Sequence, residues 1–360
     1  TGGAQTQLLE FFKYADFSAF EFWLVNLDAT VQTLTDQFAQ YPITLVHIHH
    51  HGFLNLKTIM GLFRLLKHIS PDIVQTYLFT SDTYGRLAAV LAGVPVIITS
   101  IRSLDTWKKR HHLWVDRILE KMTHKVTINA EAIRPRLKEL WSINDQKVVT
   151  IYNGIDMARF HDQSQRTAIR EIWQIPSKAL VIGMVSKFRF EKDYESFFQA
   201  AARLHAKYPH LYFVAVGNGP KQSEIETYAK THAAHVRAIF TGSRSDIPKV
   251  ISAMDICVLA THAEGCPNAL MEYMAAGKPV VSSNVGGCKE LVLEGQTGFL
   301  VEDKDVDGYT HSIEQLINNP QKCQSMGEAG KKRMQSDFST KALAQKTEAL
   351  YRALLSQHTT

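Results

Sequence analysis

The chain has 360 residues, of which 45% are hydrophobic and 21% are charged, and its formal net charge is +5. This composition is that of a soluble globular protein of about two domains, and we expect neither a disordered chain nor one that crosses a membrane, since no run of about 18 apolar residues occurs. The four cysteines form no Cys-x-x-Cys pair and no cluster with histidines at metal-ligand spacing, which favours a reducing cytoplasm over a disulfide framework or a structural zinc.

Along the chain, apolar strand-like runs alternate with amphipathic helical stretches. The predicted strands are at 43–48, 73–77, 94–99, 126–129 and 148–152, and then at 180–185, 211–216, 236–241, 256–259 and 280–282. The predicted helices include 56–69, 82–92, 194–207 and 247–253, followed by three closing helices near 305–317, 321–335 and 339–356. This alternation predicts an α/β protein with two parallel, doubly wound sheets, separated by the polar stretch 153–178.

Positive charge is concentrated between residues 100 and 140, where ten lysines and arginines accompany five acidic residues, an excess as large as that of the whole chain. Trp107 and Trp114 are interleaved there with the basic run 108–112. Basic residues mixed with tryptophans suit an anionic membrane surface, and we expect 107–114 to contact one. No nucleic-acid motif accompanies the patch, so we expect no nucleic-acid partner. An ordinary solvated helix with its tryptophans in the core is the equally weighted alternative.

The most informative stretch is 261–281, which reads Thr-His-Ala-Glu-Gly-Cys-Pro-Asn-Ala-Leu-Met-Glu-Tyr-Met-Ala-Ala-Gly-Lys-Pro-Val-Val. A loop containing Glu264 leads into a predicted helix that opens at Pro267 and stops at Gly277. The free backbone N–H groups at the helix start form a site for an anionic group such as a diphosphate. Glu264 and Glu272 flank it, and carboxylates repel phosphate but accept hydrogen bonds from hydroxyls. Phosphate and hydroxyls together indicate a sugar nucleotide, whereas two solvated glutamates are the alternative.

With its residues in this order and Gly286-Gly287 beyond it, the stretch resembles the E-x7-E signature of retaining, metal-independent glycosyltransferases. These are family 4, or glycosyl transferases group 1, which includes glycogen synthase and bacterial polysaccharide-building enzymes. The resemblance implies the GT-B fold, in which two Rossmann-like doubly wound domains face a cleft. It assigns Glu264 to the transferred sugar and Glu272 to the ribose hydroxyls. The residues between them would line the donor largely through backbone groups: Gly265, Cys266, Pro267, Asn268 and Ala269.

Two lysines follow the predicted strand 180–185, namely Lys187 and Lys192. At these positions the family carries cations that point at the donor diphosphate. Fixed cations stabilise the negative charge that grows on the departing nucleoside diphosphate, so the resemblance implies neither a metal nor another cofactor for the chemistry. Lys187 stands where arginine is common and is a point charge rather than a bidentate fork, which Arg189 can supply. Without the resemblance, two loop lysines would be interpreted as solvated.

Further donor contacts follow from the same resemblance. The base is expected near Gly242, Ser243 and Arg244, and Gly2 and Gly3 resemble the glycine loop near the diphosphate or the acceptor. In the family a strand precedes that loop, and no strand-like run precedes it here. We therefore expect the first strand to be missing and the N-terminal sheet to be incomplete.

The acceptor side departs from the family pattern. Many relatives carry a histidine after the strand that corresponds to 94–99, and this chain has Ser-Ile-Arg-Ser there. Arg102 with Asp105 resembles an Arg-Ser/Asn-x-Asp pattern of some relatives and is a candidate contact for a phosphate or the acceptor. His49, in the cluster 47–51, is a candidate acid or base on the acceptor side, although a surface strand end is the stronger interpretation.

The sequence thus predicts an acceptor-side domain over 1–155, on which the helix 339–356 packs, and a nucleotide-sugar domain over 156–338. We expect retaining hexosyl transfer from a nucleotide sugar, most readily a UDP-sugar, to a hydroxyl of a lipid-linked or growing saccharide in cell-surface polysaccharide synthesis. The expected location is the cytoplasm, at the inner face of the cytoplasmic membrane. The alternatives are a sugar-nucleotide 2-epimerase of the same fold and a non-catalytic sugar-nucleotide-binding protein. A two-domain solute-binding protein would need an export signal, which we do not find.

Overall fold

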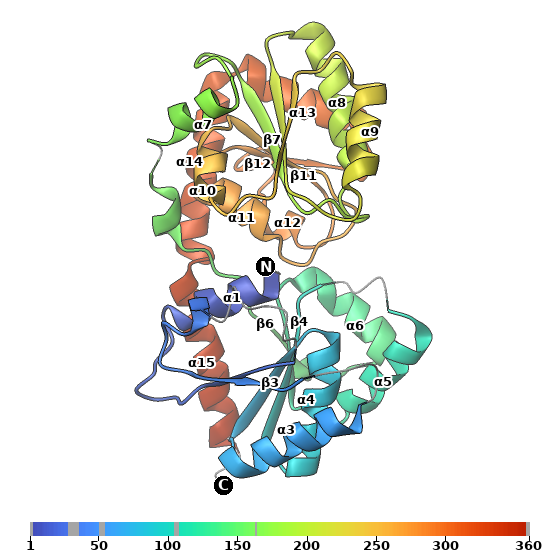
Figure 1. The fold of residues 1–360 in the computed structure, drawn as a ribbon, viewed down its shortest axis with the longest axis vertical. Helices are drawn as coiled ribbons and strands as arrows, with labels where there is room; N and C mark the ends of the chain where they lie inside the picture. The colour runs from blue at the N-terminus through green and yellow to red at the C-terminus, as the bar shows by residue number, and fades with distance from the viewer. Residues whose placement is uncertain (1–2, 28–35, 50–54, 104–107, 163, 358–360) are drawn as a thin grey trace. The chain divides into compact units, whose positions relative to one another are not determined.

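The computed structural model describes residues 3–27, 36–49, 55–103, 108–162 and 164–357, and the chain divides into two compact units (Figure 1). Unit 1 comprises Thr1–Gly154 and Thr340–Thr360, and unit 2 comprises Ile155–Ser339. The chain therefore passes from unit 1 to unit 2 after residue 154 and returns after residue 339, each within one residue of the expected boundary.

Unit 2 contains one six-stranded sheet in which every neighbouring pair of strands is parallel. Its strands are β7 (Val181–Val185), β8 (Tyr212–Val216), β9 (Ala238–Gly242), β10 (Ile256–Leu259), β11 (Val280–Ser283) and β12 (Gly298–Val301). Its α-helices are α7 (Arg166–Ile172), α8 (Tyr194–Lys207), α9 (Gln222–His232), α10 (Ile247–Ser252), α11 (Asn268–Ala275), α12 (Cys288–Leu291), α13 (Val306–Asn318) and α14 (Pro320–Asp337). The strand order β12-β11-β10-β7-β8-β9 is the doubly wound order, so the predicted Rossmann-like fold is confirmed for this unit.

The polar stretch 153–178 contains the passage from unit 1 to unit 2, and its residues from 155 onward belong to unit 2. It forms a short 3-10 helix (Met157–Phe160) and α7. Arg166 and Arg170 of α7 both pair with Asp255 in front of β10, at 2.7 Å for Arg170. Arg170 is also buried and donates to three backbone carbonyls. These contacts were not predicted, because they are long-range and no local sequence pattern indicates them.

Unit 1 has two parallel sheets, and the described residues of one form no ladder with the other. The elements in chain order are α1 (Gly3–Phe12), β1 (Trp23–Asn26), β2 (Thr44–His47), α3 (Leu56–Ile69), β3 (Ile73–Tyr77), α4 (Phe79–Ala92), β4 (Val96–Ile101), α5 (Arg110–Glu120), β5 (Lys125–Ile128), 3-10 turns Glu131–Ile133 and Asp145–Lys147 around α6 (Arg134–Trp141), β6 (Val148–Thr150) and α15 (Thr340–Ser356). β1 pairs with β2, whereas β3, β4, β5 and β6 pair in sequence order.

An apolar cavity of about 520 Å³ lies in unit 1, and both sheets contribute to its lining. Its walls come from α1, from all of β1 and β3, and from α15, with Leu24, Val74 and Tyr351 among the lining side chains. In the doubly wound order the first strand would lie between β1 and β3. The cavity therefore lies where the first strand of that order would be.

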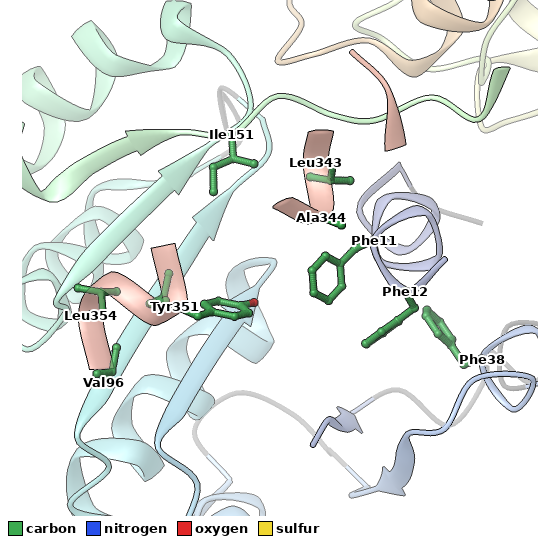
Figure 2. Close-up of a cluster of buried hydrophobic side chains, with 10 residues drawn as sticks. Phe11, Phe12, Phe38, Val96, Ile151, Leu343, Ala344, Tyr351 and Leu354 are labelled. Atoms are coloured by element: carbon green, nitrogen blue, oxygen red, sulfur yellow. The ribbon is translucent and has the colours of Figure 1, made fainter. Parts of the chain in front are cut away.

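Aromatic and aliphatic side chains from both ends of the chain form one core cluster of unit 1 (Figure 2). Phe11 and Phe12 of α1 meet edge to face, and Phe12 also packs edge to face on Phe38. Leu343, Ala344, Tyr351 and Leu354 of α15 belong to the same cluster. This cluster explains why the C-terminal helix belongs to unit 1, because the apolar face of α15 is buried in it.

A second feature of unit 1 is a buried ionic cluster formed by residues of α4, of α5 and of the segment just before α5. Arg86, which is fully buried, pairs with Asp82 and lies 3.2 Å from Asp116, and Lys108 lies 2.9 Å from the other oxygen of Asp116. Burial raises the pKa of Asp116, while Lys108 opposes that shift. Two cations and two carboxylates are thus desolvated together, an arrangement that is costly to break.

This cluster corrects one prediction for the basic patch, because the Lys108 side chain is only 4% exposed and cannot reach a membrane. Trp114 is 67% exposed, so the alternative of core tryptophans is wrong for this residue; Trp107 lies outside the described residues. Together with Ile118 and Met122, Trp114 forms an exposed apolar stripe at four-residue spacing on α5 and just beyond it. None of the helices in the described parts of the chain combines the length and apolarity needed to cross a membrane.

Candidate functional site

The carboxyl ends of β7 and β10 mark the switch point of the sheet in unit 2. These strands are neighbours, and from them the strand order runs outward in opposite directions. In open α/β sheets, ligands bind beyond the carboxyl ends of the strands at this point. The loop after β7 carries Lys187 and Lys192, and the loop after β10 carries Glu264. The fold therefore brings together two sequence motifs more than 70 residues apart.

Lys192 and Glu264 form an ion pair, with side chains 18% and 13% exposed. The sequence assigned the two residues to different groups of a substrate and did not predict that they contact each other. Their partial burial weakens screening by water, so the pair is electrostatically stronger than an exposed one. The pair fixes the position of the ammonium group at the switch point.

Backbone hydrogen bonds hold the two loops against each other. The N–H of Asp193 donates to Ala260 at 3.0 Å, and the N–H of His262 donates to Glu191 at 2.8 Å. Between these bonds, Lys192 and Thr261 form an isolated antiparallel bridge. Because this short ladder contains Lys192 and ends two residues before Glu264, the position of the ion pair is set by the backbone and not only by side-chain rotamers.

Helix α11 begins at Asn268, one residue later than predicted, with Pro267 in an extended conformation at its N-cap. Glu272 lies on this helix and is half-buried. The neighbouring Tyr273 is buried and forms two hydrogen bonds with the backbone of Val185, at 2.6 Å to the N–H and 3.2 Å to the carbonyl. Burial also raises the pKa of Tyr273, so its hydroxyl stays protonated. Tyr273 thus joins the helix that carries Glu272 to the end of β7.

Gly286 lies in the turn between β11 and α12, and its contact with Glu264 was not predicted from the sequence. Its φ of +50° lies in the left-handed region, and a Cβ atom placed there would lie 1.9 Å from the carbonyl oxygen of Glu264. Only glycine permits this approach of backbone to backbone. The Gly286-Gly287 dipeptide was visible in the sequence, but its contact with Glu264 depends on the packing of β11 beside β10.

Lys187 and Arg189 are both exposed in the loop after β7. That loop rests on the turn after β8, where Phe188 donates its N–H to Asn218 at 2.8 Å. Gly217, with φ of +144°, makes room for it, because a Cβ there would lie 2.0 Å from the Ser186 carbonyl. The Gly-Asn-Gly turn therefore shapes the loop that presents Lys187.

The other residues predicted to bind the sugar-nucleotide donor differ in the contacts that their side chains make. Arg244 is paired with Asp246 through two hydrogen bonds of 2.8 and 2.7 Å, and it follows Gly242 and the exposed Ser243 at the end of β9. Cys266 is buried with its sulfur 3.7 Å from Met271, so its side chain faces the core and not a ligand. Gly265 and Pro267 are likewise buried, and Asn268 and Ala269 are half-buried at the start of α11.

Cys288 is a potential nucleophile whose thiol is influenced by the Glu264 carboxylate. Burial, followed by the charge of Glu264, raises the pKa of Cys288 to about 12. The thiol therefore stays protonated at neutral pH and is a poor nucleophile.

The predicted acceptor-side residues belong to unit 1. Gly3 is the first residue of α1 and therefore helical, which corrects its assignment to a loop, whereas Gly2 lies outside the described residues. Arg102 follows β4, donates to Asn153 at 2.9 Å and lies 5.5 Å from the ring centre of Tyr77. His49 is exposed two residues after β2. Asp105 lies outside the described residues, so its proposed partnership with Arg102 has no structural account.

The arrangement in unit 2 is chemically specific. The loop after β7 carries the cationic side chains of Lys187 and Lys192, and the neighbouring strand β10 is followed by half-buried carboxylates at 264, in the loop, and at 272, on α11. Cations and free N–H groups bind anionic oxygen atoms, and carboxylates accept hydrogen bonds from hydroxyls. The site can thus hold a molecule with both phosphate and hydroxyl groups.

Comparison with known proteins divides the chain into the same halves. A family model described as Glycosyltransferase Family 4 matches residues 1–159, and one described as Glycosyl transferases group 1 matches residues 165–333. The UDP-Gal:alpha-D-GlcNAc-diphosphoundecaprenol alpha-1,3-galactosyltransferase of Escherichia coli is 28% identical over 276 residues, which cover 74% of this chain and 71% of that protein. The capsular polysaccharide biosynthesis glycosyltransferase CapM of Staphylococcus aureus is 24% identical over 316 residues, covering 85% and 83%.

Solved structures share the fold of the chain. Anabaena Alr3699/HepE in complex with UDP-glucose matches with a TM-score of 0.87 and 20% identity over 98% of this chain and 96% of that one. The lipopolysaccharide outer core galactosyltransferase WaaB in its apo form matches with a TM-score of 0.74 and 18% identity over the same shares.

Proposed function

The chain belongs to glycosyltransferase family 4, the glycosyl transferases group 1 with the GT-B fold, and from this premise we propose its donor, its acceptor and its mechanism. It is a glycosyltransferase. We propose that it transfers a hexosyl group from a UDP-sugar, with retention of the anomeric configuration, to a hydroxyl of a lipid-linked or growing saccharide in cell-surface polysaccharide synthesis.

The observation that carries the proposal is the Lys192–Glu264 pair at the switch point of unit 2. A lysine held by a carboxylate is positioned before any ligand arrives, and preorganised charge is the form of electrostatic stabilisation that lowers a barrier most. In the proposed complex Lys192 and Lys187 face the diphosphate, Glu264 accepts a hydrogen bond from a hydroxyl of the transferred sugar, and Glu272 accepts from the ribose.

The chemistry follows from where charge develops. Breaking the bond between sugar and phosphate leaves negative charge on the diphosphate, which the two ammonium groups and the N-terminus of α11 stabilise. We therefore propose that the transfer needs no metal, because these cations occupy the role that a divalent ion has in other phosphate chemistry. The thiol of Cys288, which stays protonated, is not a candidate nucleophile.

We further propose a contact between unit 1 and an anionic membrane surface, from the cytoplasmic side, which would suit a lipid-linked acceptor. The exposed stripe of Trp114, Ile118 and Met122 supports it. Lys109 and Arg110 lie beside this stripe, are exposed and pair with no acidic side chain in the described part of the chain. An apolar stripe flanked by cations is the pattern of helices that lie at a membrane interface.

A panel of UDP-, GDP-, ADP- and CMP-sugars in a thermal unfolding assay tests the donor, because a ligand that binds the folded state raises its melting temperature. The UDP-sugar should give the largest shift. Transfer to a saccharide acceptor in the presence of EDTA then tests the mechanism, and activity should be retained. A strict requirement for added metal would contradict the role given to the lysines.

The same assay separates this function from the alternatives. A sugar-nucleotide 2-epimerase would release UDP and an altered sugar without an acceptor, and a non-catalytic binding protein would show the thermal shift without turnover. The stereochemistry of the product, measured by NMR, tests retention.

A further inference from the structure

Three side chains in unit 2 place metal-ligating atoms together beside the Lys192–Glu264 pair. They are Asp193, His262 and Asp303, and one ligand atom from each lies within 4.8 Å of the others. The Nδ1 atom of His262 lies 2.7 Å from a carboxylate oxygen of Asp303. Ligands at about 2.1 Å from a single ion lie at most about 4.2 Å apart, so small side-chain rotations bring all three into reach of one cation.

The carboxylate of Asp193 gives independent support for a ligand here. The residue is only 6% exposed, and one of its oxygen atoms caps α8 by accepting the N–H of Ser196 at 3.0 Å. Its other oxygen, Oδ2, is buried and accepts no hydrogen bond from the described residues. A buried, charged acceptor without a partner is costly, and such groups in native proteins usually serve an ion or a water molecule.

We propose that Asp193, His262 and Asp303 bind a divalent transition-metal ion, with Zn²⁺ as the best fit. An imidazole nitrogen with two carboxylates is a set that Zn²⁺ and Mn²⁺ accept, whereas Mg²⁺ and Ca²⁺ prefer oxygen ligands alone. The exposure of Asp303, whose side chain is 40% accessible, leaves a path for entry and room for a water ligand.

The ion would act as a structural element and not in the transfer itself. It would join three loops, those after β7, β10 and β12, of which the first two are already tied by backbone hydrogen bonds. Asp193 follows Lys192 directly, and His262 precedes Glu264 by two residues. The ion would add stability to these loops, whereas the position of the ion pair is already set by their backbone hydrogen bonds, so sugar transfer is retained when the ion is removed. The existence of the metal site does not depend on the proposed sugar transfer.

Titration of the full chain, stripped with EDTA and desalted, with ZnCl₂ tests the site by calorimetry and by thermal unfolding. We expect one Zn²⁺ per chain and a rise in melting temperature that grows with its concentration, and a much smaller effect of MgCl₂. Asp193→Asn keeps the helix cap, since asparagine also caps well, but weakens the ligand set. This variant and His262→Gln should each bind Zn²⁺ at least tenfold more weakly.

Matched controls separate this site from adventitious binding by surface residues. His311→Gln and Asp307→Asn change exposed residues of the same types on α13 and should leave Zn²⁺ affinity unchanged. Lys192→Ala should also retain Zn²⁺ binding, so failure of the proposed transfer and failure of the metal site remain distinguishable. The proposal is overturned if Zn²⁺ binds Asp193→Asn and His262→Gln as tightly as the unaltered chain. It is also overturned if no stoichiometric binding of Zn²⁺ occurs.

Discussion

The two units differ at the centre of their sheets. In unit 2 the central strand β7 is buried along its whole length and pairs with β8 and β10. At the corresponding place in unit 1, the described residues form no strand between β1 and β3, and an apolar cavity of about 520 Å³ is lined by both.

This difference shows that the central strand of a doubly wound sheet serves both packing and function. In unit 2 the loop that leaves β7 carries the candidate donor-binding lysines, and β7 itself anchors α11 through Tyr273. Unit 1 contains two other stabilising features, the aromatic cluster of α1 and α15 and the ionic cluster around Arg86. We therefore expect unit 1 to be the more sensitive to loss of a buried charge, and unit 2 to tolerate less change of volume.

The largest expected effect is that of Arg86→Met in unit 1. The variant leaves Asp82 buried without its cation and Asp116 with Lys108 alone, and breaking a buried pair in this way costs about 3–5 kcal/mol of unfolding free energy. Urea unfolding with hydrogen exchange resolved by segment should show unit 1 opening first.

Arg170→Met in unit 2 is the matched comparison. Asp255 there keeps Arg166 as a partner and is itself 17% exposed, so less charge is left uncompensated and a smaller loss of stability is expected. Equal losses in the two variants would contradict the view that unit 1 depends more on its buried charges.

Lys192→Ala should remove function from unit 2 without unfolding it. Loss of one preorganised donor to a developing charge typically raises the barrier by about 3 kcal/mol, so kcat should fall by about 100-fold or more. The melting temperature should change little, because the lysine side chain is not part of the core. Lys230→Ala, an exposed lysine of α9, is the control and should transfer sugar normally. Retained turnover in Lys192→Ala would remove Lys192 from the mechanism.

Much of the fold was predictable because its signals are local. The strands β3 and β10 have the predicted bounds, and the apolar run of β10 is continuous, as expected for a strand buried on both faces. The strands β1 and β12 were not predicted. Both have four residues, and in the described part of the chain each pairs with one neighbouring strand, β1 with β2 and β12 with β11. So short a run has no clear period, and only its tertiary partner makes it a strand.

The candidate site was predictable as residues but not as contacts. The spacing of Glu264 and Glu272 and the loop lysines were visible in the sequence, whereas the Lys192–Glu264 pair arises from adjacency of β7 and β10. For Lys108 the sequence predicted the wrong environment. It belongs to a basic run that indicates an exposed patch, yet its partner Asp116 draws it into the interior. A run of charged residues in a sequence does not indicate which of its members has a buried residue of opposite charge as a partner.

A matched pair of substitutions tests the difference in packing between the units. Val214 of β8 is fully buried, and Val214→Leu should overpack the core and cost about 1–3 kcal/mol of unfolding free energy. Val74 of β3 lines the cavity, so the added methylene of Val74→Leu should enter existing space and be neutral or stabilise by up to about 0.8 kcal/mol. Urea midpoints measure both. A loss in Val74→Leu as large as that in Val214→Leu would mean that the cavity cannot accept a side chain.

The smallest expected effect concerns the surface of unit 1. Trp114→Ser should weaken sedimentation with vesicles that contain anionic lipid by several-fold, because it removes the most exposed apolar residue of the α5 stripe. Lys109→Gln should do the same by roughly 1 kcal/mol, and only at low salt, where a cation near an anionic surface is unscreened. Ile172→Ser removes a 66% exposed apolar residue from unit 2 and should leave vesicle binding unchanged. If all three variants bind alike, or if neutral vesicles bind as well as anionic ones, the stripe is an ordinary solvated helix face, and the asymmetry between the units is confined to their interiors.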